Sequence, residues 1–245
     1  MSVAEILQTR RLRALDREPR ADAFSNIFFS GTTYSLWRAA KEPTSQYSRG
    51  LVLDAGSGRG AWKSIIEQNA TRESVDIAPK AGERVTWIAD LTDMPQVPTD
   101  RYDAAVCHQV LEHVPDPAAA ARELQRVLKP GGTLVISVPH LSRQHELPHD
   151  YFRFTPQGLR RLLEDAGFEV RSVAGYGGVL CFLHHQFATA FIGLASIARP
   201  LHYLATLVNA PLSVFAMKID ELFDRKKLLA VGVVAVAVSP ASRNV

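Results

Sequence analysis

Alternating runs of apolar and polar residues begin at residue 50 and predict a sheet covered by helices. Short runs rich in branched or aromatic apolar side chains predict strands at Leu51–Asp54, Ser74–Ile77, Val85–Ala89, Ala104–Cys107, Thr133–Val138 and Phe168–Val173. Stretches with helical patterning predict helices at Ala61–Gln68, Ala118–Leu128 and Pro156–Ala166. Strands that alternate with helices are typical of a parallel sheet with helices on both faces, an α/β fold.

The first 49 residues show no strand pattern. Apolar residues recur at loose helical spacing among four arginines before Pro19, with Arg20 directly after it, which predicts a basic helix that ends near that proline. A second helix is expected through Tyr34 and Trp37, stopping before Pro43. We expect residues 1–49 to form an N-terminal helical lid on a main domain made of residues 50–177 and 226–245.

The last third of the chain is almost free of charge. Residues 172–198 contain no Asp, Glu, Lys or Arg, and after Arg199 the same holds for Leu201–Met217. Residues 178–225 therefore predict an apolar helical insertion, two short helices joined near Arg199-Pro200. The run Leu228–Val238 then predicts a buried strand that returns to the main domain.

The uncharged stretch is long enough for a membrane-spanning helix, but glycines and histidines interrupt it. We expect a helical hairpin at a membrane surface instead, with peripheral contact through residues 179–217. Two alternatives stay open, a soluble cap packed on the core and a homodimer interface.

Composition narrows the class of protein. With 245 residues, 47% hydrophobic and 22% charged, the chain can build a sizeable core, which excludes disordered and fibrous proteins. A net charge of +3 is too small to indicate a nucleic-acid partner, and none is expected. Two cysteines without metal spacing suit a reducing compartment and no bound metal. The N-terminal residues do not resemble a secretory signal, so we expect a cytoplasmic protein, at the inner face of the membrane if the insertion contacts lipid.

The sharpest motif is a glycine loop after the first predicted strand, Val52-Leu-Asp-Ala-Gly-Ser-Gly-Arg-Gly60. Such a loop lets a ligand approach the backbone and favours a negative group at the helix that follows. Gly56-x-Gly58-x-x-Ala61 also fits a dinucleotide fingerprint, with Asp76 at the ribose-binding distance. Asp54 beside the loop favours a ligand that carries an amine, and Asp90 places an acid at the end of the third strand as well. Both features count against a nicotinamide or flavin cofactor.

Five segments in order over about residues 50–140 resemble the class I S-adenosylmethionine-dependent methyltransferases, in particular the type 11 group. They are VLDAGSGRG, SVDIAP, WIADLTDMP, AAVCHQVLEHVPDP and LKPGGTLVISVP. The resemblance implies a doubly wound, seven-stranded, mostly parallel sheet whose last strand is antiparallel and lies beside the fifth. It also implies S-adenosylmethionine as cofactor and methyl transfer as activity.

The resemblance assigns cofactor roles by position. One set of residues would hold the methionine end of the cofactor: Asp54, Gly56, Ser57, Gly58 and His108. Asp76 would accept both ribose hydroxyls, Ile77 would lie against the adenine, and Asp90 with Leu91 would contact its edge. Glu112-His113 is interpreted as pocket wall.

The acceptor side is predicted on the polar segment 139–155, which follows the fifth strand. His149 with Asp150 is the first candidate for a general base and His145 the second, unless these groups only brace the loop. The predicted acceptor is a small or lipid-linked molecule, sugars included, methylated at oxygen. The alternatives are a cofactor-binding scaffold without turnover and, less favoured, a nicotinamide-dependent oxidoreductase.

Overall fold

The computed structural model describes residues 24–78 and 84–241. The expected basic helix that ends near Pro19 lies outside them. The chain divides into two compact units. Within the described residues, the helical unit comprises 24–38 and 176–231, and the sheet unit comprises 39–78, 84–175 and 232–241.

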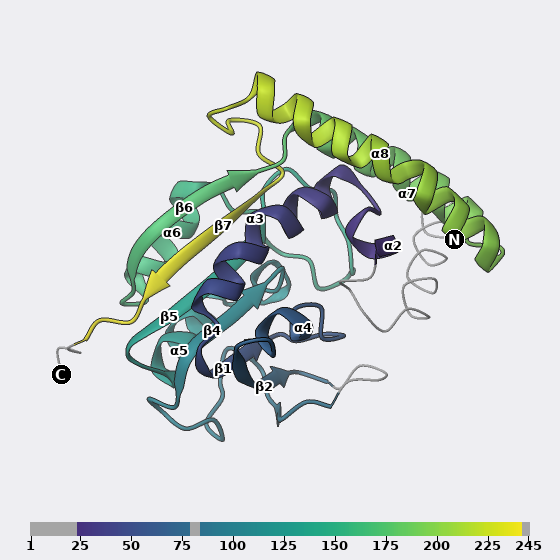
Figure 1. The fold of residues 1–245 in the computed structure, drawn as a ribbon. Coiled ribbons are helices and arrows are strands. Elements are labelled where there is room, and N and C mark those ends of the chain that lie inside the picture. Colours follow the sequence, from purple (N-terminus) through teal and green to yellow (C-terminus); the bar gives the residue numbers. More distant parts are fainter. Residues whose placement is uncertain (1–23, 79–83, 242–245) are drawn as a thin grey trace. The chain divides into compact units, whose positions relative to one another are not determined.

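The sheet unit is built on seven strands in the order β3-β2-β1-β4-β5-β7-β6 (Figure 1). The strands are β1 (Gly50–Ala55), β2 (Ala70–Asp76), β3 (Trp87–Ile88), β4 (Tyr102–His108), β5 (Leu128–Pro139), β6 (Glu169–Tyr176) and β7 (Gly232–Val238). Strands β3, β2, β1, β4 and β5 are parallel, and β7 is antiparallel to β5, with Val135 opposite Val236. The predicted architecture, with an antiparallel last strand beside the fifth, is confirmed.

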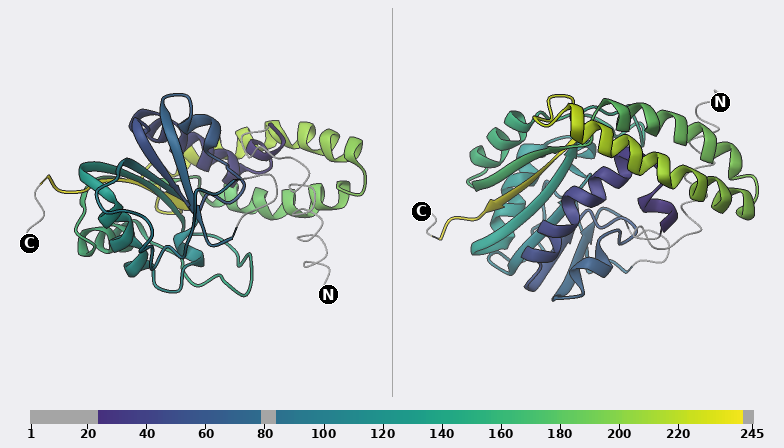
Figure 2. Two further views of the ribbon diagram at one scale, coloured as in Figure 1. Left: turned by 90° about the horizontal axis from the view of Figure 1, so that it is seen from below. Right: turned by 45° about the horizontal axis from the view of Figure 1, so that its top comes forward.

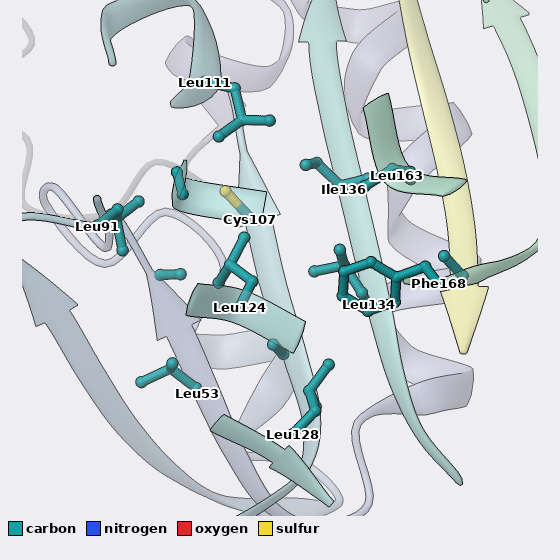
Figure 3. Packing of buried hydrophobic residues seen from close by; sticks show 14 of the residues in the cluster. Leu53, Leu91, Cys107, Leu111, Leu124, Leu128, Leu134, Ile136, Leu163 and Phe168 are labelled. Atoms are coloured by element: carbon teal, nitrogen blue, oxygen red, sulfur yellow. The ribbon is translucent and has the colours of Figure 1, made fainter. Parts of the chain in front are cut away.

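Side chains of the central strands alternate between two apolar layers, as the period of a strand requires. Val52 of β1 packs with Ile66 of helix α4 (Lys63–Ile66). Leu53, the next residue, packs in the larger cluster with Leu124 of α5 (Pro117–Val127) and Leu163 of α6 (Pro156–Asp165) (Figure 3). Each fully buried side chain of this kind contributes roughly 1.5–3 kcal/mol. Because these strands are parallel, their carboxyl ends meet at one edge of the sheet, and ligands of such folds bind to the loops at that edge.

Side-chain caps begin the two helices of the larger layer. Asp116 accepts a hydrogen bond from the N–H of Ala119 over 2.9 Å, and Thr155 accepts one from Gly158 over 3.0 Å. A proline follows each cap, where its missing N–H costs nothing. The Thr155 cap predicted from the sequence is confirmed. A single turn of 3₁₀ helix, η1 (Leu111–His113), follows β4.

The helical unit consists of α2 (Phe24–Ile27), the start of α3 (Gly31–Tyr47), and a hairpin of α7 (Val179–Ala195) and α8 (Arg199–Phe223). Helices α7 and α8 run side by side (Figure 2). They join at residues 196–198, close to the predicted Arg199-Pro200, but at 17 and 25 residues they are not the short helices expected.

Polar contacts hold the helical unit together. Asn209 of α8 donates to the carbonyls of Phe28 and Phe29, over 3.0 and 2.6 Å. The buried Asp220 carboxylate, also on α8, accepts from the N–H groups of Leu180 and Cys181 over 3.0 and 2.8 Å. Asp220 therefore caps the first turn of α7 from 40 residues away.

Several predicted boundaries differ from the structure, and polar contacts explain two of these differences. Helix α3 does not stop before Pro43 but continues to Tyr47. An internal proline costs about 3 kcal/mol, and buried contacts of the last turn offset this, among them the Thr44 hydroxyl, 2.9 Å from His108 Nε2. The last strand begins at Gly232, not Leu228, because the Asp224 carboxylate accepts from the N–H groups of Leu228 and Leu229 and holds them in a turn.

Candidate active site

The glycine loop after β1 has the backbone conformation that glycine permits. Gly56, Gly58 and Gly60 have φ angles of +67°, +54° and +72°. A Cβ on Gly56 would lie 2.5 Å from Val110, whereas one on Gly58 would have only the Gly56 carbonyl, at 4.0 Å. The backbone at Gly58 therefore borders open space. Ser57 is buried, and its hydroxyl has no hydrogen-bond partner among the described residues.

Asp76, at the end of β2, is fixed against this loop. Its Oδ2 accepts a hydrogen bond from Gly58 N–H over 2.7 Å, and its Oδ1 accepts one from Ala78 N–H over 3.3 Å. The carboxylate is nearly buried, at 8% exposure, whereas the neighbouring Ile77 is 68% exposed. A fixed acid and an exposed apolar side chain thus adjoin the glycine loop.

Asp54 of β1 forms a buried ion pair with Arg72 of β2. Arg72 Nε donates to Asp54 Oδ2 over 2.8 Å, and both side chains are about 95% covered. Sequence reasoning missed Arg72. Arg72 precedes the predicted strand Ser74–Ile77 and lies in the part of β2 that the sequence pattern did not assign to a strand, so its charge did not indicate a buried pair.

Asp90 and Leu91 follow β3 in a tight turn. Asp90 Oδ1 accepts from the N–H and the hydroxyl of Thr92, over 2.9 and 2.8 Å. Leu91 is buried in the main core cluster. The Asp90 carboxylate therefore braces the turn, and Leu91 directs its side chain to the core.

His108, the last residue of β4, is a buried neutral ring. Its Nε2 lies 2.9 Å from Thr44 Oγ1 and its Nδ1 lies 2.9 Å from Ser137 Oγ. The Trp62 ring packs on it with centroids 4.3 Å apart. Burial lowers the pKa of His108 to about 3. Both ring nitrogens are engaged, so its backbone is the part left for a ligand. The three partners were not foreseen from the sequence.

The loop after β5 brings Asp150 to His145 and Arg153 rather than to the His149 ring. Arg153 donates to both Asp150 oxygens over 2.6 and 2.7 Å, and His145 N–H donates to Oδ2 over 2.8 Å. Burial opposes ionisation of Asp150, but these hydrogen bonds outweigh it and lower its pKa to about 2. His149 is exposed, with Nδ1 2.9 Å from the Tyr151 hydroxyl.

The same loop docks on η1. Tyr151 N–H donates to the Glu112 carbonyl over 2.8 Å, and His113 Nδ1 lies 2.6 Å from the His149 carbonyl oxygen. The Glu112 side chain is completely buried, and burial raises its pKa to about 8. His145 packs edge-on against His113, with ring centroids 4.8 Å apart. Burial also lowers the pKa of His145.

Comparisons with known proteins agree with this arrangement. A family model described as "Methyltransferase domain" matches residues 31–173. Among curated proteins, a ubiquinone biosynthesis O-methyltransferase of Nitrosospira multiformis is 28% identical over 154 residues, covering 51% of this chain. That match spans 64% of the relative, so the chain covers less than two thirds of its length.

Solved structures share the fold. The [4+2]-cyclase SpnF has a TM-score of 0.55 at 19% identity, with 84% of this chain and 82% of that chain covered. The Burkholderia thailandensis 1,6-didemethyltoxoflavin-N1-methyltransferase, solved with S-adenosylhomocysteine, has a TM-score of 0.51 at 20% identity, with 95% and 90% covered. At these identities the likeness concerns the fold alone.

Proposed function

The chain belongs to the class I S-adenosylmethionine-dependent methyltransferases, and we propose that it transfers a methyl group from this cofactor to an oxygen atom of a small-molecule acceptor. The observation that carries the proposal is the glycine loop at the carboxyl end of β1, open at Gly58 and tied to Asp76 of β2. The curated relatives named as O-methyltransferases support oxygen as the methylated atom.

The residues at the loop fit the cofactor. The open backbone at Gly58 leaves room for a ligand, and the buried Ser57 hydroxyl, which has no hydrogen-bond partner within residues 24–78 and 84–241, offers it a polar group. When bound, S-adenosylmethionine supplies a methyl group on a sulfonium sulfur. Asp76 would accept the ribose hydroxyls, and the exposed Ile77 would lie against the adenine.

The remaining cofactor contacts are proposed on the same sheet edge. Asp54, oriented by Arg72, would hold the amine of the methionine end together with the Gly56 backbone. Asp90 and the Leu91 backbone would meet the adenine edge, and the His108 backbone would lie near the methionine. The buried Arg72 partner restricts how Asp54 can turn, which fixes its carboxylate before the ligand arrives.

The acceptor is proposed to bind at the loop 140–155. Methyl transfer is an in-line displacement, so these residues align the acceptor and exclude water. A hydroxyl acceptor must also lose its proton. His149 is the proposed base, with His145 as second candidate because its ring is kept neutral by burial. Asp150 holds the loop through Arg153.

A lipid-linked acceptor and peripheral contact with an anionic membrane are the finer part of the proposal. Large apolar side chains are exposed along the hairpin, among them Leu183, Phe187, Leu194, Leu201, Leu204, Leu207, Phe215 and Phe223. Exposed patches of this kind mark interaction surfaces. Arg225 and Lys226, exposed beyond α8, favour anionic lipid as the occupant and the inner face of the membrane as location. Among the described residues, no helix has the length and hydropathy to cross a bilayer.

The test is a panel of soluble and lipid-linked hydroxyl compounds incubated with the full chain and S-adenosylmethionine. Release of S-adenosylhomocysteine and a methyl group on oxygen, found by mass spectrometry, are expected with one acceptor class. Cofactor binding without release for any acceptor would indicate a scaffold without turnover. A melting temperature raised by a nicotinamide cofactor instead would indicate an oxidoreductase.

A further inference from the structure

Three side chains at the carboxyl edge of the sheet converge, and we infer that they bind a divalent metal ion of the zinc class. They are Glu112 and His113 of η1 and His145 of the loop after β5, together called the Glu112 cluster. One possible ligand atom from each lies within 4.8 Å of the others. This differs from the expectation of no metal, which rested on cysteine spacing.

Both imidazoles have one nitrogen left for a ligand. His113 Nδ1 lies 2.6 Å from the His149 carbonyl oxygen, and His145 Nδ1 lies 3.3 Å from the Arg143 carbonyl oxygen. A carbonyl only accepts, so each Nδ1 carries the proton and each Nε2 keeps a lone pair. Histidines that bind metals usually have this support, the second nitrogen donating to a carbonyl or carboxylate.

The Glu112 carboxylate has no hydrogen-bond partner on another described residue, and a bound cation would fill that role. Both oxygens are buried, and neither has a hydrogen-bond partner on another of the described residues. The nearby Arg153 is committed to Asp150 through two hydrogen bonds. Glu112 Oε1 lies 3.8 Å from His113 Nε2. A buried carboxylate is normally paired or bound to a metal.

Two imidazoles and one carboxylate form the donor set of zinc sites that keep a position open for water or substrate. Ligands about 2.1 Å from a tetrahedral ion are roughly 3.4 Å apart, so the cluster must contract slightly. His145 lies on a loop and can make that movement.

The role of the ion rests on the proposed function. Its open position would take the acceptor hydroxyl and lower the pKa of that hydroxyl, which eases proton loss to His149 before methyl transfer. With Nε2 on the ion and Nδ1 protonated, His145 would no longer serve as the second candidate for the base. Binding itself does not depend on methyl transfer, so the two proposals can fail separately.

The test uses the full chain, stripped with a chelator and titrated with Zn²⁺ against a chromophoric competitor, without cofactor or acceptor. One ion per chain is expected. Glu112→Gln and His145→Asn should each weaken Zn²⁺ at least about 100-fold, since even outer-shell changes cost 10–100-fold. His140→Asn, a histidine of the same loop outside the cluster, should stay within threefold.

Co²⁺ provides a second readout, because its visible absorption reports the ligands directly. The band expected for the parent should be lost in both variants. Circular dichroism of the metal-free variants checks folding, and His145→Asn, at a half-exposed loop position, keeps the test valid should Glu112→Gln not fold. A parent that binds no Zn²⁺, or variants that bind Zn²⁺ and Co²⁺ as the parent does, would overturn the inference.

Discussion

Asp76 is the residue on which proposed cofactor binding depends most. Its carboxylate is held by two backbone N–H groups at the mouth of the glycine loop. Asp76→Ala removes charge-assisted hydrogen bonds in a nearly buried position, so we expect S-adenosylmethionine binding to weaken by about 2–4 kcal/mol, roughly 30- to 1,000-fold. Isothermal titration calorimetry measures this loss. Asp165→Ala, at the exposed end of α6, is the control and should bind as the parent does, whereas an unchanged dissociation constant for Asp76→Ala would remove Asp76 from the site.

His149 allows the chemistry to be separated from binding. If it is the base for a hydroxyl acceptor, His149→Ala should lower kcat about 10²–10⁴-fold. Its exposed ring does not touch the glycine loop in any described contact, so cofactor affinity should stay within twofold. Steady-state kinetics and calorimetry on one preparation make the comparison. A kcat within threefold of the parent would assign the proton to His145 or leave alignment as the only contribution.

His108 makes stability depend on pH with a definite sign. Its pKa is about 3 when folded and 6.5 when unfolded, so between these values the unfolded chain binds more protons. Stability therefore falls as the pH drops below 6.5, by about 2 kcal/mol at pH 5. Urea unfolding at pH 7 and pH 5 should show this loss of unfolding free energy in the parent. In His108→Gln the loss should be smaller by about 2 kcal/mol. Equal losses in both proteins would contradict the buried neutral ring.

At the scale of residues, the sequence located the glycine loop but not the partners of its acids. Asp54, Asp76 and Asp90 were identified because motif spacing is local. The Arg72 partner of Asp54 depends on strand register, which is not encoded in spacing along the chain.

The start of α7 is an element whose stability rests on another helix. Its N-cap, Gly178, has no side chain, and Asp220 of α8 accepts from the N–H groups of Leu180 and Cys181 instead. Asp220→Ala leaves these amides without their acceptor, so we expect a loss of about 1–3 kcal/mol in the helical unit. Hydrogen exchange at residues 179–182 should quicken. Glu221→Ala, exposed on the same helix, is the matched control, and equal exchange in both variants would speak against this cap.

Elements were predictable where burial follows a simple period. The strands β1, β4 and β5 were found because parallel strands covered on both faces are apolar throughout. Two predicted boundaries were wrong because a polar contact sets the observed one. The Thr44 contact lies in the turn that extends α3 past Pro43, and Asp224 holds Leu228 in a turn before the last strand. Helix α4 has four residues, fewer than the predicted Ala61–Gln68, because the chain leaves the glycine loop through turns.

The exposed apolar side chains of the hairpin give a prediction for the whole molecule. The full chain should float with anionic liposomes, more weakly at high salt but still detectably, since salt screens charges and not apolar burial. Arg225 and Lys226 should each contribute roughly 1 kcal/mol to the free energy of binding to anionic liposomes. Leu204→Glu with Phe215→Glu should abolish flotation, whereas Ile88→Glu, an exposed position of the sheet unit, should not.

Light scattering on the same samples gives the outcomes that contradict this prediction. A monomer that never floats would return the hairpin to a soluble cap. A stable dimer that never floats would assign the apolar surface to contact between subunits.

The antiparallel pairing of β7 also sets an order of assembly during synthesis. Strand β5 ends at Pro139 and its neighbour starts at Gly232, so more than ninety residues must leave the ribosome before that side of β5 is filled. Closing so long a connection is entropically slow. Until then the nascent chain carries an apolar strand with an unfilled edge, which is the kind of surface that chaperones cover and that aggregation exploits.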